Sequence, residues 1–219
     1  MSNLRIEKKF VFGKYKKDLV EKLLLINNFS KIYPDREISS IYLDTLNFDF
    51  ARDNINGINE RKKIRIRWYN NDLKKIYLEE KNKKNFHVWK NILKMNIPPN
   101  KKNLIHNLKS LFFNHYNVGQ NINNFNYNFI LKTNYKRNYW LSNNGKIRAT
   151  IDTDINTCPV ENMTKIIDLP ETILEFKFAP NSEIFFREFL SQKGLNIRSK
   201  KYSKYLQSFV ALEESGLIN

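Results

Sequence analysis

Polar and apolar residues alternate with a period of two along several segments of the chain, and most of the polar positions carry a charge. In residues 5–12, Arg5, Glu7 and Lys9 lie on one side of an extended backbone and Phe10 lies on the other. Charged or hydrogen-bonding residues at positions i and i+2 recur as Arg65/Arg67, Glu79/Lys81, Tyr135/Arg137, Arg148/Thr150/Asp152 and Glu175/Lys177. This alternation predicts β-strands with one charged face.

The predicted elements place many strands in succession, mostly without crossover helices between them. Strands are predicted at residues 5–12, 38–45, 61–69, 75–83, 128–141, 145–155 and 173–178. Helices are predicted at residues 15–29, 101–116, 181–194 and 202–214, a turn at residues 53–57 and an Asn-rich loop at residues 121–128. This order predicts an α+β fold with an antiparallel sheet. Because no linker or repeat divides the chain, residues 1–219 are expected to form one domain.

The charged strand faces admit two interpretations. In a half-exposed sheet they are the solvent faces, and this is the simpler interpretation for any single strand. Taken together, however, six strands repeat Arg, Lys and Glu at matched positions, and four helices with apolar stripes are available to cover the apolar faces. A closed barrel with charged side chains inside and helices outside satisfies both patterns.

Composition limits the class of protein. The 219 residues are 41% hydrophobic and 14% aromatic, which is enough for a packed core and argues against intrinsic disorder. The formal net charge of +16 indicates an anionic partner, although abundant Lys, Asn and Ile also fit an A/T-rich genome and a basic outer surface. Cys158 is the single cysteine, and neither a signal-peptide pattern nor an apolar run of about 20 residues occurs. The chain is therefore expected to be cytoplasmic.

An interior lined with Arg and Lys requires an anion inside it, because the cations otherwise repel one another. The planar guanidinium of Arg matches the oxygens of phosphate, which favours a phosphate chain as that anion. Glu175, Glu7 and Glu79 are then candidate ligands for a divalent metal that bridges the phosphates. For Glu79, an ion pair with a neighbouring lysine is an equally good interpretation.

The order and spacing of these segments resemble the triphosphate tunnel metalloenzymes and, within them, the VTC (vacuolar transporter chaperone) polyphosphate polymerase domain. The resemblance covers almost the whole chain. It rests on Arg5-x-Glu7-x-Lys9-Phe10, Ser40-Ile41-Tyr42-Leu43-Asp44-Thr45, Arg52-Asp53-Asn54-Ile55-Asn56-Gly57, the basic run of residues 61–69, Leu78-Glu79-Glu80-Lys81, Tyr135-Lys136-Arg137, Ile151-Asp152-Thr153-Asp154, Leu174-Glu175-Phe176-Lys177 and Lys201-Tyr202-Ser203-Lys204-Tyr205. Each fragment alone is common in strands, and it is their combination that is specific.

The resemblance implies an eight-stranded antiparallel tunnel that binds ATP with Mn²⁺ or Mg²⁺ and transfers the γ-phosphate to a growing inorganic polyphosphate chain. It implies that phosphates are held by Lys9, Arg65, Arg67, Lys81, Arg137, Lys201 and Lys204, the first five as the catalytic set, and that Glu175 holds the metal. Lys90 matches a further phosphate-binding lysine, and the remaining substrate-binding candidates are Lys177, Arg5 and Arg148. Related tunnel enzymes use paired acidic residues for metal where Glu7 stands. The Arg at position 5 favours the polymerase branch.

Phosphoryl transfer requires in-line positioning and neutralisation of phosphate oxygens, which fixed cations and one metal can supply. No Cys/His or Ser/His arrangement for a covalent intermediate is evident in the sequence. Lys201 and Lys204 are three residues apart, so they are predicted to share a helix face near its N-terminus, a favourable place for phosphate.

Other functions remain open at this stage. The same fold permits a hydrolase of tripolyphosphate or nucleoside triphosphate, because water can replace the phosphate acceptor. A non-catalytic module that binds polyphosphate or RNA is a further alternative, since the basic run of residues 61–67 is followed by Trp68 and Tyr69. ATP and inorganic polyphosphate are the expected partners, and nucleic acid is not. Fungal polymerases of this family also carry a regulatory domain and membrane helices, so membrane coupling is expected to need a separate protein here.

Overall fold

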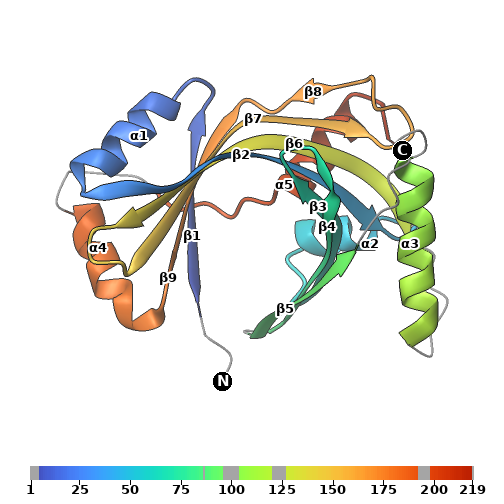
Figure 1. Cartoon of the computed structure of the whole chain (residues 1–219), viewed down its shortest axis with the longest axis horizontal. Helices are drawn as coiled ribbons and strands as arrows, with labels where there is room; N and C mark the ends of the chain where they lie inside the picture. Colours follow the sequence, from blue (N-terminus) through green and yellow to red (C-terminus); the bar gives the residue numbers. More distant parts are fainter. Residues whose placement is uncertain (1–4, 86, 96–103, 120–126, 192–197, 219) are drawn as a thin grey trace. The chain divides into compact units, whose positions relative to one another are not determined.

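The computed structural model of the chain describes residues 5–85, 87–95, 104–119, 127–191 and 198–218. Its strands form one antiparallel sheet with the order β1-β9-β7-β6-β2-β3-β4-β5, and β8 pairs with β7 outside this path (Figure 1). The strands are β1 (Ile6–Gly13), β2 (Phe29–Asp44), β3 (Glu60–Tyr69), β4 (Asp72–Lys84), β5 (His87–Met95), β6 (Asn128–Ser142), β7 (Ile147–Pro159), β8 (Ile167–Asp168) and β9 (Glu171–Phe178). The helices are α1 (Lys17–Ile26), α2 (Asp49–Ile55), α3 (Leu104–Gly119), α4 (Glu183–Ser191) and α5 (Lys204–Glu214), with a 3₁₀ turn, η2 (Pro180–Ser182).

Every strand predicted from the alternation is present, and the α+β class with an antiparallel sheet is confirmed. Several elements differ from the prediction, and β2 begins at Phe29 although its strand was predicted at residues 38–45. Residues 53–55, expected in a turn, end helix α2, while β5 and the two-residue β8 were not predicted. The start of the helix expected at residues 101–116, the end of the one at 181–194 and most of the Asn-rich loop lie outside the described residues.

The sheet is not closed into a barrel by backbone hydrogen bonds. Its order begins at β1 and ends at β5, and within the described ranges these two strands are not paired with each other. The prediction of a closed barrel is wrong on this point. Strand alternation determines which side chains share a face, but it carries no information on whether the two edge strands pair.

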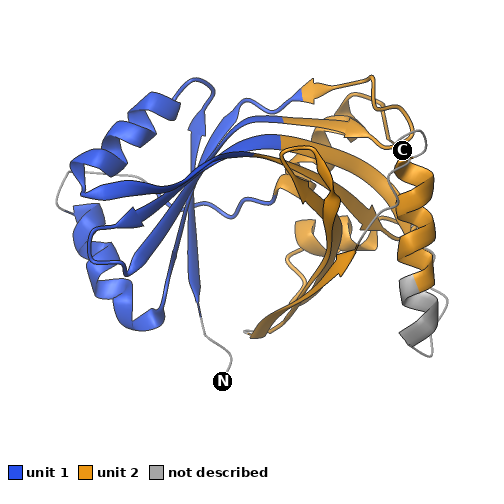
Figure 2. Cartoon of the chain, viewed as in Figure 1, with its two compact units in different colours: residues 1–36, 135–155, 168–203 blue, residues 37–134, 156–167, 204–219 orange. Residues whose placement is uncertain are grey.

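The chain divides into two compact units (Figure 2). Unit 1 comprises residues 1–36, 135–155 and 168–203, and unit 2 comprises residues 37–134, 156–167 and 204–219. Strands β2, β6 and β7 contribute residues to both units.

Aromatic side chains form the core of unit 1. Phe176 of β9 is 1% exposed, and its ring lies 5.1–5.9 Å from the rings of four other phenylalanines, Phe10, Phe29, Phe186 and Phe189. Helices α1 and α4 supply the cover for this face, with Val20 and Leu24 from α1 among the buried residues (Figure 1). The apolar side of the alternation is thus buried beneath two helices.

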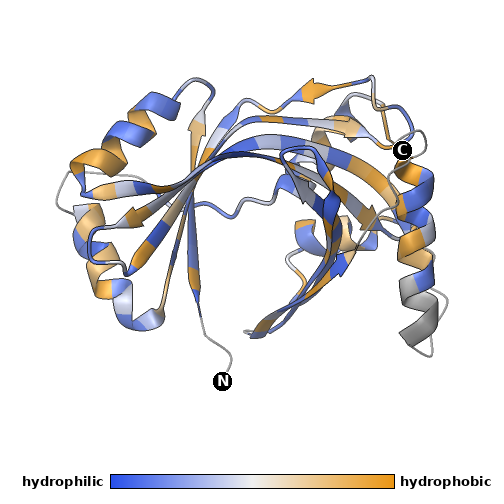
Figure 3. Ribbon diagram, in the orientation of Figure 1, coloured by the Kyte–Doolittle hydropathy of each residue, from blue (hydrophilic) through white to orange (hydrophobic). Residues whose placement is uncertain are grey.

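Unit 2 buries apolar residues on both faces of its strands. On one face, Ile64 and Ile66 of β3 pack with Leu108 and Phe112 of α3. On the other face, which we call the inner face, Tyr42 of β2 lies in a cluster with helices α2 and α5. Hydrophobic and hydrophilic residues alternate along these strands in Figure 3. Part of the inner face is therefore apolar, and the rest of it carries charge.

No helix in the described parts of the chain is both long and apolar enough to cross a membrane.

The aromatic core of unit 1 gives a first prediction. Phe176→Ala should lower the free energy of unfolding by about 3–5 kcal/mol, because it removes a ring that contacts four others and leaves a cavity. Ile184→Ala, on α4 but 62% exposed, is the control and should change it by about 0.5 kcal/mol or less. Urea denaturation followed by tryptophan fluorescence measures both, and equal losses would contradict the assignment of the core.

Candidate functional site

The inner face of β3 and β4 carries six cationic side chains and one carboxylate. The register pairs Arg61 with Lys83, Lys63 with Lys81, Arg65 with Glu79 and Arg67 with Tyr77, so these eight residues share one face. The intervening residues, such as Ile64, Ile66 and Leu78, belong to the apolar cluster beneath α3. The charged and apolar faces predicted from the sequence are therefore confirmed for these strands.

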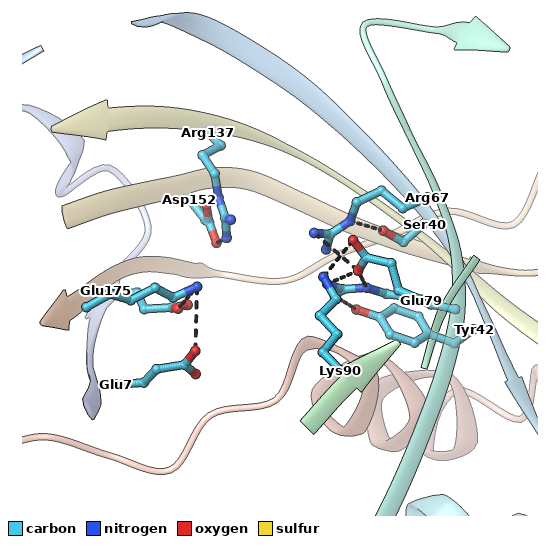
Figure 4. A network of polar contacts seen from close by, with 11 residues as sticks. Glu7, Ser40, Tyr42, Arg67, Glu79, Lys90, Arg137, Asp152 and Glu175 are labelled. Carbon is cyan, nitrogen blue, oxygen red and sulfur yellow. Dashed lines mark hydrogen bonds and ion pairs between the residues drawn. The ribbon is translucent and has the colours of Figure 1, made fainter. Parts of the chain in front are cut away.

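Glu79 is the centre of this face. Its Oε2 accepts hydrogen bonds from Arg65, with Nε at 2.6 Å and Nη2 at 2.5 Å, and lies 3.7 Å from Nη1 of Arg67. Its Oε1 lies 2.8 Å from Nζ of Lys90, which reaches it from β5 (Figure 4). One buried carboxylate thus holds three cations from two neighbouring strands.

Neutral side chains of β2 complete the arrangement. Arg67 Nε donates to the hydroxyl of Ser40 at 3.2 Å, and Arg65 Nη1 donates to the hydroxyl of Tyr42 at 3.4 Å. Both contacts follow from the β2–β3 register, which pairs Ser40 with Arg67 and Tyr42 with Arg65. Each guanidinium is therefore oriented by more than one acceptor.

The charge of Glu79 is fixed by its neighbours. Burial alone would raise the pKa of this carboxyl, but Arg65, Arg67 and Lys90 outweigh burial and lower the pKa from 4.5 to about 2. Burial in turn lowers the pKa of Lys90, against the opposing effect of its contact with Glu79. Among the two interpretations of Glu79, metal ligand and ion pair, this geometry supports the ion pair.

A second cluster lies in unit 1, on β1 and β9. The register pairs Glu7 with Lys177 and Lys9 with Glu175. Lys177 Nζ lies 2.8 Å from the carboxylate of Glu175 and 3.6 Å from that of Glu7 (Figure 4). Burial would raise the pKa of Glu175, but Lys177, Lys9 and Arg137 lower it from 4.5 to about 2.

Arg137 of β6 is held by Asp152 of β7 in the same unit. Its Nε and Nη2 donate to the two carboxylate oxygens of Asp152 at 2.5 and 2.7 Å (Figure 4). Although burial opposes it, Asp152 raises the pKa of Arg137, so this guanidinium stays charged. A bidentate pair of this kind fixes the plane of the guanidinium.

The other predicted site residues are distributed more widely. Lys9 Nζ donates to the backbone carbonyl of Tyr202 at 2.8 Å. Arg5 and Arg148 are exposed, although Arg148 pairs with Lys177 in the β7–β9 register. The expectation that Lys201 and Lys204 share a helix face is wrong, because α5 begins at Lys204 and Lys201 precedes it.

Oxygen-bearing side chains from β1, β7 and β9 lie around Glu175. Glu7 and Glu175 supply carboxylate oxygens from neighbouring strands, and the hydroxyl of Thr150, whose Cα pairs with that of Glu175, is buried without a hydrogen-bond partner in the described structure. Within the same described ranges, no group of three or more His, Cys, Asp or Glu side chains gathers into a metal cluster. Two carboxylates and a hydroxyl suit Mg²⁺ or Mn²⁺ that takes its other ligands from phosphate and water.

Four residues with a part in this geometry were missing from the predicted site: Ser40, Tyr42, Asp152 and Tyr202. The sequence could have indicated the first three, because they occupy the same alternating positions of their strands as charged residues do. Tyr202 contributes its backbone carbonyl, which side-chain chemistry does not indicate.

The fold of the chain is similar to solved structures of proteins described as candidate adenylyl cyclases. One from Hippeastrum, whose dominant activity is described as a triphosphatase, has 15% identity and a TM-score of 0.54 over 99% of this chain and 98% of its own. Proteins from Vibrio parahaemolyticus and Bacillus halodurans, both described as candidate adenylate cyclases, each have 12% identity and a TM-score of 0.55. They cover 95% and 92% of this chain and 99% and 95% of their own. At these identities the likeness shows the fold.

The sequence itself gives the family. The family model of the VTC domain matches residues 4–213, and the chain therefore belongs to the VTC domain family. The resemblance drawn from the ordered motifs is thus confirmed. No curated protein sequence matches the chain.

The buried carboxylates give a pH-dependent prediction. Because the pKa values of Glu79 and Glu175 are lowered on folding, their contribution to stability is present above pH 4.5 and is lost as the pH falls towards 2. Glu79→Gln or Glu175→Gln should therefore cost about 3 kcal/mol of unfolding free energy at pH 7, and this difference should shrink towards zero near pH 2.

Denaturant unfolding at a series of pH values measures this effect. Glu60→Gln is the matched control, because Glu60 pairs with Lys84 on an exposed surface and both side chains are about 60% exposed. A constant difference between wild type and Glu79→Gln from pH 7 to pH 2 would contradict the assigned charge state.

Proposed function

We propose that the chain is a polyphosphate polymerase, a single VTC-like domain that transfers the γ-phosphate of ATP to the end of an inorganic polyphosphate chain with Mn²⁺ or Mg²⁺. The observation that carries the proposal is the inner face of β3 and β4, which carries six cations and one carboxylate. Cations are abundant on that face, and the guanidinium of Arg is well matched to phosphate oxygens. Membership of the VTC domain family supports the same chemistry.

The length of the cationic row favours a long anion. Arg61 and Arg67 are six residues apart along β3, which at about 3.4 Å per residue is roughly 20 Å. Lys63, Lys81 and Lys90 lie next to one another across three strands within this row. Three linked phosphates are much shorter than the row, so its far end is best explained by a longer phosphate chain.

The role of Glu79 in this proposal is to orient the cations before phosphate arrives. Arg65 and Arg67 are fixed by Glu79 and by the hydroxyls of β2, which reduces the reorganisation needed when charge develops on phosphate oxygens. Cations held in place by a carboxylate still have N–H groups that can donate to an anion, because Arg has five of them.

Glu175 and Glu7 are proposed to hold the metal, with Thr150 as a neighbouring hydroxyl. A bound divalent metal supplies charge neutralisation on bridging phosphate oxygens during in-line transfer. Lys177, which contacts both carboxylates, balances their negative charge and keeps them oriented. Within unit 1, this pair of carboxylates is the best candidate for the metal that phosphoryl transfer needs.

A hydrolase is the second candidate. The Hippeastrum protein with the same fold is described as having a dominant triphosphatase activity, and water can replace a phosphate acceptor without any change in the cationic face. RNA binding is less well supported, because it gives no role to the acidic residues of the other strands, Glu7 and Glu175 on β1 and β9.

The two enzymatic candidates are separated by their products. Purified protein with ATP and Mn²⁺ should produce ADP and polyphosphate that forms a ladder on a gel. Orthophosphate release from ATP or tripolyphosphate without chain growth would decide for the hydrolase. Glu175→Gln should lose Mn²⁺ binding measured by calorimetry as well as turnover, and unchanged Mn²⁺ binding would overturn the metal assignment.

The cationic row gives a prediction with a matched control on the same strand. Lys63→Ala removes an inner-face cation, whereas Lys62→Ala removes a cation whose side chain contacts Glu80 and Tyr127. Lys63→Ala should weaken binding of long-chain polyphosphate about tenfold, in line with one charged hydrogen bond, and Lys62→Ala should leave it within about twofold. Calorimetry with polyphosphate of defined length measures both, and equal effects would contradict a role for the inner face.

A further inference from the structure

Asp44, the last residue of β2, joins three elements of unit 2 and has no place in the chemistry described so far. Its side chain is fully buried, and its carboxylate accepts hydrogen bonds from the backbone amides of Thr45, Phe50 and Ala51 at 2.7–3.0 Å. These bonds fasten the start of helix α2 to β2. A fourth donor is the hydroxyl of Tyr205, in the first turn of α5.

Tyr205 connects Asp44 to the inner face. Its ring is 1% exposed and stacks on the ring of Tyr42, with centroids 5.1 Å apart and planes inclined by 30°. Burial and the adjacent Asp44 raise the pKa of Tyr205, which keeps its hydroxyl protonated as the donor. Leu131 and Phe209 enclose the same pair of rings. The position of Tyr42 is thus set by a ring that is itself fixed by Asp44.

Tyr42 then reaches the cationic row. Its hydroxyl accepts a hydrogen bond from Nη1 of Arg65, while Nε and Nη2 of the same guanidinium bind Glu79. Two acceptors on opposite sides of the guanidinium fix its plane. One of these acceptors is a carboxylate on β4, and the other is a phenol whose ring is clamped against α5.

We propose that Tyr42 and Tyr205 are positioning residues of the phosphate-binding face. In this proposal, the contact of Tyr205 with Asp44 couples the packing of α5 against β2 to the orientation of Arg65. The inference rests on the proposed function, in which Arg65 binds phosphate. Lys204, a predicted phosphate-binding residue, directly precedes Tyr205, so the same contact also sets where the first turn of α5 presents this lysine. Asp44 thereby positions two cations from elements that are distant in sequence.

Conservative variants separate positioning from folding. Tyr42→Phe keeps the stacked ring and removes the acceptor for Arg65, and Tyr205→Phe keeps the ring and removes the donor to Asp44. Tyr127→Phe is the matched control, because the hydroxyl of this buried tyrosine of unit 2 contacts Lys62 at 3.2 Å and its ring belongs to the apolar cluster beneath α3.

The readouts are steady-state kinetics with ATP and calorimetric binding of inorganic tripolyphosphate. Tyr42→Phe should lower kcat about five- to tenfold with KM for ATP within about twofold, since Arg65 remains present but is less well oriented for the transition state. Tyr127→Phe should leave both parameters within about twofold. Equal values of kcat for Tyr42→Phe and wild type would overturn the role of Tyr42.

The coupling through α5 is tested by a double-mutant cycle. Lys204→Ala should weaken tripolyphosphate binding more in the wild-type background than in Tyr205→Phe, because the variant has already lost the placement of Lys204. Strictly additive effects would overturn the coupling. Wild-type protein that binds tripolyphosphate but makes no polyphosphate would count against the polymerase alone, and the binding cycle would still decide the inference.

Discussion

The pairing of a single buried carboxylate with several cations is the interaction on which the polar side of this protein depends. Arg65, Arg67 and Lys90 stand close enough to repel one another in a setting with little water, and Glu79 offsets that repulsion while it fixes their directions. Glu175 has the equivalent role among the cations of unit 1. Each carboxylate therefore offsets the repulsion among its neighbouring cations and orients their side chains.

The two units distribute charge differently, and the difference fits the separate roles proposed for them, phosphate binding and metal binding. In unit 2, the inner face of β3 and β4 carries six cations and one carboxylate, whereas in unit 1 Asp152 binds Arg137 and Lys177 lies between Glu7 and Glu175. A surface with excess positive charge binds phosphate directly, and a balanced one with paired carboxylates is better suited to a metal.

The alternation of polar and apolar residues predicted much of the fold and of the site. Along β3, β4 and β9 it assigns each side chain to one face of the sheet without any knowledge of tertiary contacts. The alternation did not predict those elements whose structure depends on tertiary contacts. Strand β5 has mostly exposed residues and so lacks a clear alternation, and residues 53–55 read as a turn until the carboxylate of Asp44 caps the helix before them. Lys201 was placed on a helix because the sequence does not mark Lys204 as its first residue. Pairing between edge strands has no local signal at all.

The hydrogen bond from Tyr205 to Asp44 spans 161 residues of sequence. During synthesis, β2, β3 and β4 leave the ribosome long before α5 does, so their cations and Glu79 can meet while the ring of Tyr42 still lacks its stacking partner. Long-range contacts of this kind form late in folding. On the proposed function, the phosphate-binding face is therefore completed only once α5 has been made, and a nascent chain that lacks α5 presents Arg65 without the stacked ring that orients Tyr42.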